Sequence, residues 1–99
     1  MRAKVNVAPQ VEDFVNSLAP EPRRLLRMAI KALANDRGDI KHLEGGLEGY
    51  SRFRVSGDRV IFAERAQRGE RIIDCAFAEK RSVVYELFLR LLSEGLVGQ

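Results

Sequence analysis

The segment GYSRFRVSGDRVIF, residues 49–62, decides the fold of this chain. Within it, Arg52 and Arg54 point to one side of an extended backbone, whereas Phe53 points to the other. The dipeptide at positions 56–57, Ser-Gly, suits a two-residue turn between strands, because glycine adopts the backbone conformations that such turns need. The segment therefore predicts a β hairpin with one apolar face and one basic face.

The same alternation continues on both sides of this hairpin. A turn at residues 67–70 leads into another strand at 71–78, which extends the hairpin to an antiparallel meander. Apolar side chains at helical spacing predict two helices, which begin after Pro9 and near Pro22 and are separated by a break at residues 19–22. The remaining predicted elements are a first strand at residues 3–7, a connecting loop at 38–49, and a last helix with Ser82 as its N-cap and Gly95 as its stop.

These elements predict an α+β fold, in which an antiparallel meander sheet packs against an N-terminal helical hairpin and carries a C-terminal helix. The 99 residues fit a single domain spanning 1–99, and the contents of 45% hydrophobic and 31% charged residues are ordinary for a globular chain. No run approaches the roughly 20 apolar residues of a membrane helix. We therefore expect no membrane partner.

The first residues, 1–7, lack the long apolar core of a secretory signal, so we expect a strand there. Cys75 is the single cysteine and lies in an apolar run, which predicts a buried structural thiol. A reducing, cytoplasmic location fits both features.

The basic residues are unusual in kind more than in number. Lysine and arginine total 17 against 14 acidic residues, and arginine accounts for thirteen of the 17. Strand alternation places Arg52 and Arg54 together, and hairpin pairing brings Arg59 close to them. Converging guanidinium groups repel one another unless an anion lies between them, so the arrangement indicates a phosphate site.

Two further residues, Arg81 and Tyr85, lie where the last predicted strand leads into the N-terminus of the last helix. Such a terminus attracts phosphate, and a tyrosine there can stack on a base or exchange a proton. The alternative is that the arginines form a solvated sheet face and that Tyr85 is a half-buried core residue.

The order of elements, with GYSRFRVSGDRVIF and then KRSVVYE at residues 80–86, resembles the RelE/ParE superfamily of toxins from type II toxin-antitoxin modules. The resemblance covers nearly the whole chain. It implies a RelE-like fold and a ribosome-dependent endoribonuclease, or mRNA interferase, that inhibits translation by cutting messenger RNA in the ribosomal A site. Cleavage in RelE-like members proceeds by attack of a ribose 2′-hydroxyl on the adjacent phosphate, with no metal and no cofactor.

Carried over by motif, the resemblance assigns catalytic roles to Arg59, Arg81 and Tyr85 and RNA-binding roles to Arg52 and Arg54. Many relatives have histidine before the late arginine, whereas this chain has Lys80, which we assign to RNA binding. The register of this motif stays open among residues 79–81.

Two loop residues complete the candidates. Glu48 is a candidate general base, with a solvated loop charge as the alternative reading, and His42, the only histidine, is expected to be a surface residue. The glycines of loop 38–49 lack the Lys-Ser/Thr ending of a phosphate-binding loop, so that motif is not expected.

The last helix has more apolar residues than one small sheet should cover, which predicts an antitoxin-binding surface. Its residues would be Val84, Leu87, Phe88 and Leu91. Two other functions stay open, a ParE-like inhibitor of DNA gyrase and a degenerate, non-catalytic binding module.

Overall fold

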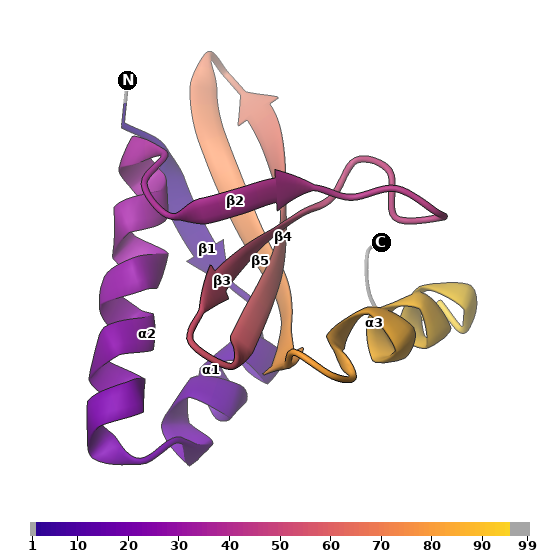
Figure 1. Ribbon diagram of the computed structural model, residues 1–99. Helices are drawn as coiled ribbons and strands as arrows, with labels where there is room; N and C mark the ends of the chain where they lie inside the picture. The colour runs from indigo at the N-terminus through magenta and orange to yellow at the C-terminus, as the bar shows by residue number, and fades with distance from the viewer. Residues whose placement is uncertain (1, 96–99) are drawn as a thin grey trace.

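The computed structural model describes residues 2–95, so Met1 and the last four residues of the predicted domain lie outside the described residues. One five-stranded sheet forms the centre of the molecule (Figure 1). The elements in chain order are β1 Lys4–Val7, α1 Pro9–Ser17, α2 Pro20–Ala32, the 3-10 helix η1 Leu33–Asn35, β2 Asp39–His42, β3 Ser51–Val55, β4 Asp58–Gln67, β5 Glu70–Lys80 and α3 Val84–Ser93.

The sheet order is β1-β5-β4-β3-β2, in which β3, β4 and β5 form the predicted antiparallel meander and β2 extends it at one edge. β1 adds to the other edge, parallel to β5, with Lys4 opposite Ile72. The loop predicted at residues 38–49 is wrong in its first part, because Asp39–His42 is the edge strand β2. Its Ile40 lies opposite the buried Phe53, which gives this short strand one apolar contact with the core.

The start of α2 and the N-cap of α3 differ from the predicted positions by one or two residues. α2 begins at Pro20, not Pro22, because proline suits the first helical turn and the break is confined to the preceding two residues. Ser82 is not the N-cap of α3. That position belongs to Val83, whose amide bonds to the carbonyl of Lys80 in a turn without a side-chain cap.

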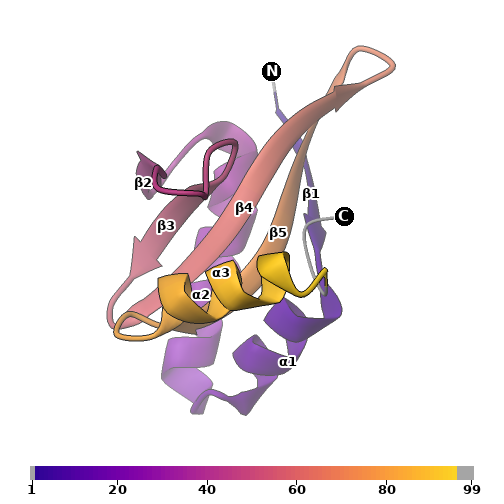
Figure 2. The same ribbon diagram turned by 90° about the vertical axis from the view of Figure 1, so that its right-hand side faces the viewer.

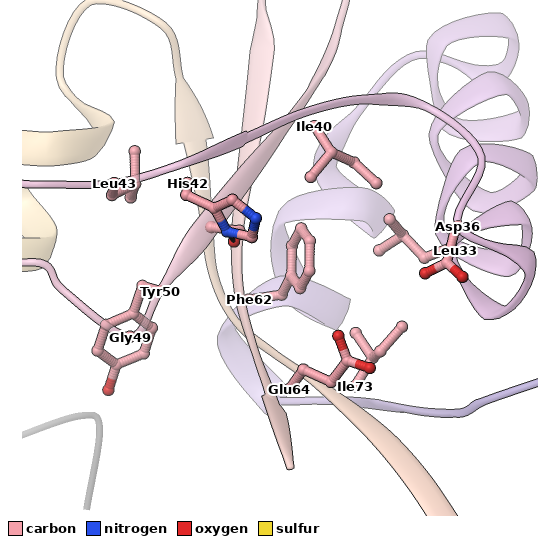
Figure 3. A pocket seen from close by; sticks show the side chains of 11 residues that line it. Leu33, Asp36, Ile40, His42, Leu43, Gly49, Tyr50, Phe62, Glu64 and Ile73 are labelled. Carbon is pink, nitrogen blue, oxygen red and sulfur yellow. Dashed lines mark hydrogen bonds between the residues drawn. The ribbon is translucent and has the colours of Figure 1, made fainter.

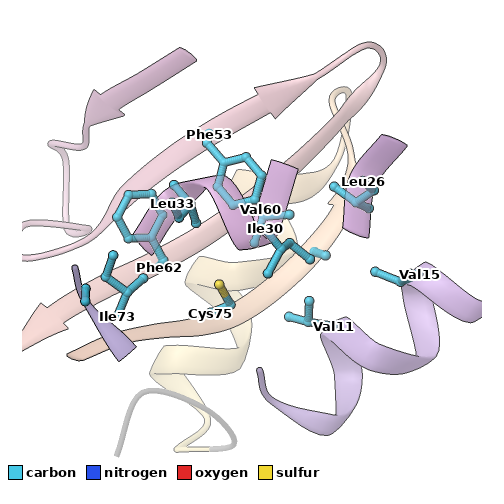
Figure 4. Close-up of a cluster of buried hydrophobic side chains, with 12 residues drawn as sticks. Val11, Val15, Leu26, Ile30, Leu33, Phe53, Val60, Phe62, Ile73 and Cys75 are labelled. Atoms are coloured by element: carbon cyan, nitrogen blue, oxygen red, sulfur yellow. The ribbon is translucent and has the colours of Figure 1, made fainter. Parts of the chain in front are cut away.

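The sheet has a hydrophobic cluster on each face. On one face, the helical hairpin α1 and α2 covers the sheet in the cluster drawn in Figure 4. Its described members include Val11, Val15, Leu26, Ile30, Leu33, Phe53, Val60, Phe62, Ile73 and Cys75. Cys75 is 1% exposed, which confirms the buried thiol, and burial, with a smaller contribution from Asp74, raises its pKa to about 12.

α3 crosses the opposite face, as Figure 2 shows. Its Val84 and Phe88 pack on Ile61 and Phe77 from the sheet and on Leu47 from the segment after β2. Ile61 and Phe62 are neighbours in β4 and belong to the clusters on opposite faces of the sheet, and the register shift in the β4–β5 pairing lies between them. The C-terminal helix therefore has a core of its own, separate from that of the helical hairpin.

Candidate functional site

The arginines predicted to converge lie on the face of the sheet that carries α3. Arg54 in β3 is directly opposite Arg59 in β4, and Arg52 is opposite Ile61, which packs under α3. The hairpin forms because Ser56 takes a left-handed conformation, with φ of 54°, at the tight turn between the two strands. Sequence alternation thus placed the three guanidinium groups on the correct face.

Arg59 is buried, whereas sequence reasoning put it on an exposed surface. Only 6% of it is exposed, and its Nη1 donates hydrogen bonds to the carbonyls of Ser56 at 3.1 Å and Asp58 at 3.0 Å. Within residues 2–95, no carboxylate lies within ion-pair distance of it. Arginine is rarely buried without a counter-charge, because both desolvation and repulsion disfavour it.

The electrostatic surroundings of Arg59 are those of a basic cluster. Burial is the main cause that lowers its pKa, and the nearby Arg54 lowers it further. Arg52 and Arg81 act in the same direction, while Tyr85 opposes them. The structure therefore brings together Arg52, Arg54, Arg59, Arg81 and Tyr85, five of the predicted site residues. We call this group the arginine cluster.

Asp39 binds two members of the arginine cluster from the edge strand β2. Arg52 Nη1 donates to the Asp39 carbonyl at 2.9 Å and to its Oδ1 at 3.2 Å, while Arg54 Nη2 lies 2.6 Å from Oδ2. The hydrogen bond from Arg52 is the main cause that lowers the pKa of Asp39, and the charges of both arginines add to it. Sequence reasoning missed this residue because its segment was taken as loop.

A cleft of about 450 Å³ borders the cluster, between β2, α3 and the segment that connects β2 to β3. Arg52 and the half-buried Tyr85 line it together with Lys41, a second residue missed in the loop assignment. Leu89 of α3 closes another side, and it approaches Gly46 so tightly that a Cβ there would lie 3.3 Å from its Cδ2. The cleft can hold a flat base beside Tyr85 with a phosphate near the basic side chains.

Arg81 and Lys80 are adjacent in the chain but lie in different surroundings. Arg81 is exposed at the end of β5, where its amide bonds to the Gly57 carbonyl at 2.8 Å. Lys80 pairs with the buried Asp58 at 2.8 Å and lies over the ring of Phe14 in α1, 5.5 Å from its centroid. It therefore points to the helical-hairpin face, away from the arginine cluster, and the structure does not support its assignment to RNA binding.

Glu48 is exposed in the connecting segment, where its carboxylate accepts a hydrogen bond from the Gly46 amide at 3.1 Å. It is not among the side chains that line the cleft. The position of Glu48 outside the cleft gives no support to its predicted role as general base.

The predicted antitoxin residues divide into two kinds. Val84 and Phe88 lie on the side of α3 that faces the sheet and are completely buried, so they cannot contact a partner while the helix is in place. Their assignment to the antitoxin-binding surface is therefore corrected. Leu87 and Leu91 are half-buried at its margin. The apolar surplus expected here is smaller than predicted, since the separate core under α3 absorbs part of it.

A second cleft, of about 590 Å³, opens on the helical-hairpin face (Figure 3). Leu33, Ile40 and Phe62 are among the residues that line it, and His42 lies at its edge with Nδ1 2.8 Å from the Ser51 hydroxyl. His42 is exposed, as expected for a surface histidine, and it lines both this cleft and the one that borders the arginine cluster.

Across residues 2–95, no group of three or more His, Cys, Asp or Glu side chains is arranged to hold a metal ion. None of the helices in that part of the chain has the length and apolar character needed to cross a membrane.

Solved structures provide the comparison that identifies the fold. No family model and no curated protein sequence matches this chain. A YoeB/ParE toxin from Agrobacterium tumefaciens superposes with a TM-score of 0.64 at 14% identity, over 79% of this chain and 98% of that one. The chain has the RelE/ParE toxin fold.

One chain from each of two toxin-antitoxin complexes matches this chain with a similar TM-score. The archaeal RelE-RelB complex from Pyrococcus horikoshii OT3 contains a chain with a TM-score of 0.63 at 22% identity, over 82% of this chain and 97% of that one. The RelBE2 toxin-antitoxin complex from Mycobacterium tuberculosis has a TM-score of 0.64 at 16% identity, over 82% and 100%. These matches confirm the predicted RelE-like fold over 79–82% of this chain.

Proposed function

We propose that this protein is the toxin of a type II toxin-antitoxin module and cleaves messenger RNA in the ribosomal A site. The observation that carries the proposal is Arg59, a buried guanidinium without a carboxylate partner among the described residues and with other arginines around it. Burying a charge among like charges is costly, and an anion bound there would offset that cost. The planar donors of arginine suit phosphate, so we propose RNA phosphate as the anion. The protein would bind this RNA in the cytoplasm.

The reaction we propose is a transesterification within the messenger RNA. The ribose 2′-oxygen bonds to the adjacent phosphorus, the bond from phosphorus to the 5′-oxygen breaks, and the products are a 2′,3′-cyclic phosphate and a 5′-hydroxyl end. The proton of the 2′-hydroxyl passes to solvent water, and a proton from solvent or from Tyr85 reaches the 5′-oxygen. Charge accumulates on the phosphoryl oxygens in the transition state, where the preorganised donors of Arg59 and Arg81 would stabilise it.

Tyr85 fits the remaining role. It lines the cleft beside Arg52. Its hydroxyl could carry one of the two protons, and its ring could stack on a base. Arg52 and Arg54 would hold the flanking phosphates.

A purified translation system tests the proposal. Added protein is expected to cut messenger RNA only when it is being translated, at a position within the A-site codon, with a cyclic phosphate on the upstream fragment. Arg68→Ala, on the β4–β5 turn, is the matched control that removes a positive charge outside the arginine cluster. Intact messenger together with inhibited DNA gyrase would replace this proposal with the ParE-like one, whereas no effect on either target would indicate a non-catalytic binding module.

We also propose an antitoxin partner, because two of the matched structures are complexes of RelE with RelB or of the RelBE2 pair. On this chain the partner would cover the outer side of α3, where Leu89 is 39% exposed and Leu87 and Leu91 are half-buried. An acidic segment laid across the adjacent arginine cluster would block RNA as well.

Co-expression with the product of the adjacent reading frame tests this partner. A stable complex should form and should be lost in the double variant Leu87→Asp, Leu91→Asp. The Arg68→Ala control should retain it. A complex that survives both leucine substitutions would place the partner elsewhere on the surface.

A further inference from the structure

The arginine cluster already holds an anion, and that anion belongs to the protein. Asp39 presents a different oxygen to each of two guanidinium groups, Oδ1 to Arg52 and Oδ2 to Arg54. A phosphate would bind the same donors with two of its oxygens, because phosphate, like a carboxylate, offers more than one acceptor oxygen to neighbouring arginines. The carboxylate therefore occupies the position that the proposed substrate requires.

The register shows why Asp39 can do this. Asp39, Arg54, Arg59 and Glu79 lie in one row across four strands, so the two arginines have an acidic residue on each side. Glu79 accepts a hydrogen bond from the backbone amide of Lys80 and forms no ion pair with the row. Asp39 is thus the carboxylate that neutralises the cluster.

Two features make its contacts exchangeable. The side chains of Asp39 and Arg54 are 44% and 52% exposed, so water and salt screen their attraction and little is lost when they separate. Asp39 is also the first residue of β2, an edge strand of four residues. Arg52 differs, since only 14% of its side chain is exposed and it is anchored by the Asp39 backbone carbonyl as well.

We propose that the Asp39 carboxylate acts as a built-in competitor for RNA phosphate, which occupies the arginine cluster in the free protein and is displaced when RNA binds. This inference rests on the proposed function, since it assumes that the cluster binds RNA. Arg81 is exposed and has no carboxylate partner among the described residues, so it provides the first contact to an entering phosphate, which the buried Arg59 then meets inside the cluster. Displacement then frees Arg54 for the neighbouring phosphate, while Arg52 stays in place through the backbone carbonyl. The carboxylate lowers RNA affinity and keeps the two arginines in position before binding.

A binding measurement separates this inference from the cleavage reaction. The probe is a short single-stranded RNA with 2′-O-methyl riboses, which has no nucleophile and stays intact, and binding is followed by fluorescence anisotropy at several salt concentrations. Asp39→Asn keeps the size and the backbone carbonyl but removes the charge. We expect it to bind about tenfold more tightly than the parent, equivalent to one more charge-assisted contact.

The salt dependence gives an independent readout. Because RNA displaces Asp39 in the parent, parent and variant make the same phosphate contacts, so Asp39→Asn should raise the affinity and leave the slope of log affinity against log salt nearly unchanged. Arg54→Ala, which removes one phosphate contact, should reduce that slope by about 0.7. Asp39→Ser, which also lacks the charge, should behave in the same way as Asp39→Asn, and both Asp39 variants are checked for parental thermal unfolding.

The matched control is Asp36→Asn. It changes net charge by the same amount, but Asp36 pairs with Arg71 and lines the second cleft on the helical-hairpin face. Asparagine also tolerates its left-handed backbone, with φ of 57°. Its affinity should stay within about twofold of the parent, because a charge on the far side of the sheet is largely screened.

Two results would overturn the inference, and only the second would also overturn the proposed function. If Asp39→Asn binds no more tightly than Asp36→Asn while Arg54→Ala binds more weakly, the cluster is a phosphate site but Asp39 is no competitor. If Arg54→Ala and Arg59→Met also leave binding unchanged, the arginine cluster is not an RNA site, and the proposed function fails with the inference.

Discussion

Replacing Arg59 with methionine tests whether the buried guanidinium serves cleavage without contributing to stability. Methionine fills much of the same volume, so the change removes the guanidinium without leaving a large cavity. The variant loses the two hydrogen bonds from Nη1 to the Ser56 and Asp58 carbonyls. At about 1 kcal/mol each, these losses total about 2 kcal/mol.

The opposing contribution comes from desolvation and repulsion. Arg59 is 6% exposed and has positive neighbours, and replacing buried charges with apolar side chains is often neutral or stabilising by about 1–4 kcal/mol. The two contributions are similar in size. We therefore expect the free energy of unfolding of Arg59→Met to stay within about 1 kcal/mol of the parent, the difference between these terms.

Cleavage should respond very differently. Loss of one preorganised donor to a developing oxyanion typically costs about 3 kcal/mol, or a rate reduction of roughly a hundredfold. Urea unfolding of the purified variant gives the stability, and single-turnover cleavage of ribosome-bound messenger gives the rate. Cleavage by Arg59→Met at the parental rate would refute this reasoning. A loss of more than about 3 kcal/mol in the free energy of unfolding would also refute it, because a loss of that size is expected for a core residue.

Three other perturbations test the two cores and the carboxylates. Phe88→Ala should destabilise the protein by about 3–5 kcal/mol in urea unfolding, because Phe88 is completely buried against Phe77. The thiol of Cys75 should resist alkylation in the native state at neutral pH and react only in denaturant, since its pKa is raised to about 12 by burial. The hydrogen bond from Arg65 is the main cause that lowers the pKa of Asp74 below its unfolded value, so its stabilisation is present above that value and is lost as pH falls through the folded pKa. Asp74→Asn should therefore lower the melting temperature at about pH 6 and have little effect at about pH 2, and an equal decrease at both values would contradict this assignment.

The meander could be predicted from sequence because its strands alternate clearly and its turns contain glycine. The same reasoning placed Arg52, Arg54 and Arg59 on one face, since strand register follows directly from a two-residue turn. It could not show that Arg59 is buried. That outcome depends on the neighbouring strand and on the turn carbonyls that its guanidinium contacts, which are tertiary features.

The missed strand β2 explains most of what was missed in the site. Its four residues lie beside a glycine-rich stretch, and short edge strands have a weak periodic signal. The alternation of Asp39 and Lys41 with the apolar Ile40 was the available clue. Lys80 was misplaced for a related reason, because a motif register that stays open among three residues leaves the choice of sheet face open too.

The separate core under α3 has a consequence for how the protein responds to heat. Among the described residues, that cluster contains five buried residues, against twelve on the helical-hairpin face, so the free energy that holds α3 in place should be smaller than the free energy of global unfolding. Tyr85 belongs to this weakly held helix, whereas the arginines belong to the sheet. Warming should release the tyrosine first, leaving a folded, RNA-binding but inactive molecule. Hydrogen exchange would then be faster in α3 than in β4, and the rate of cleavage would decline at temperatures where the sheet is still intact.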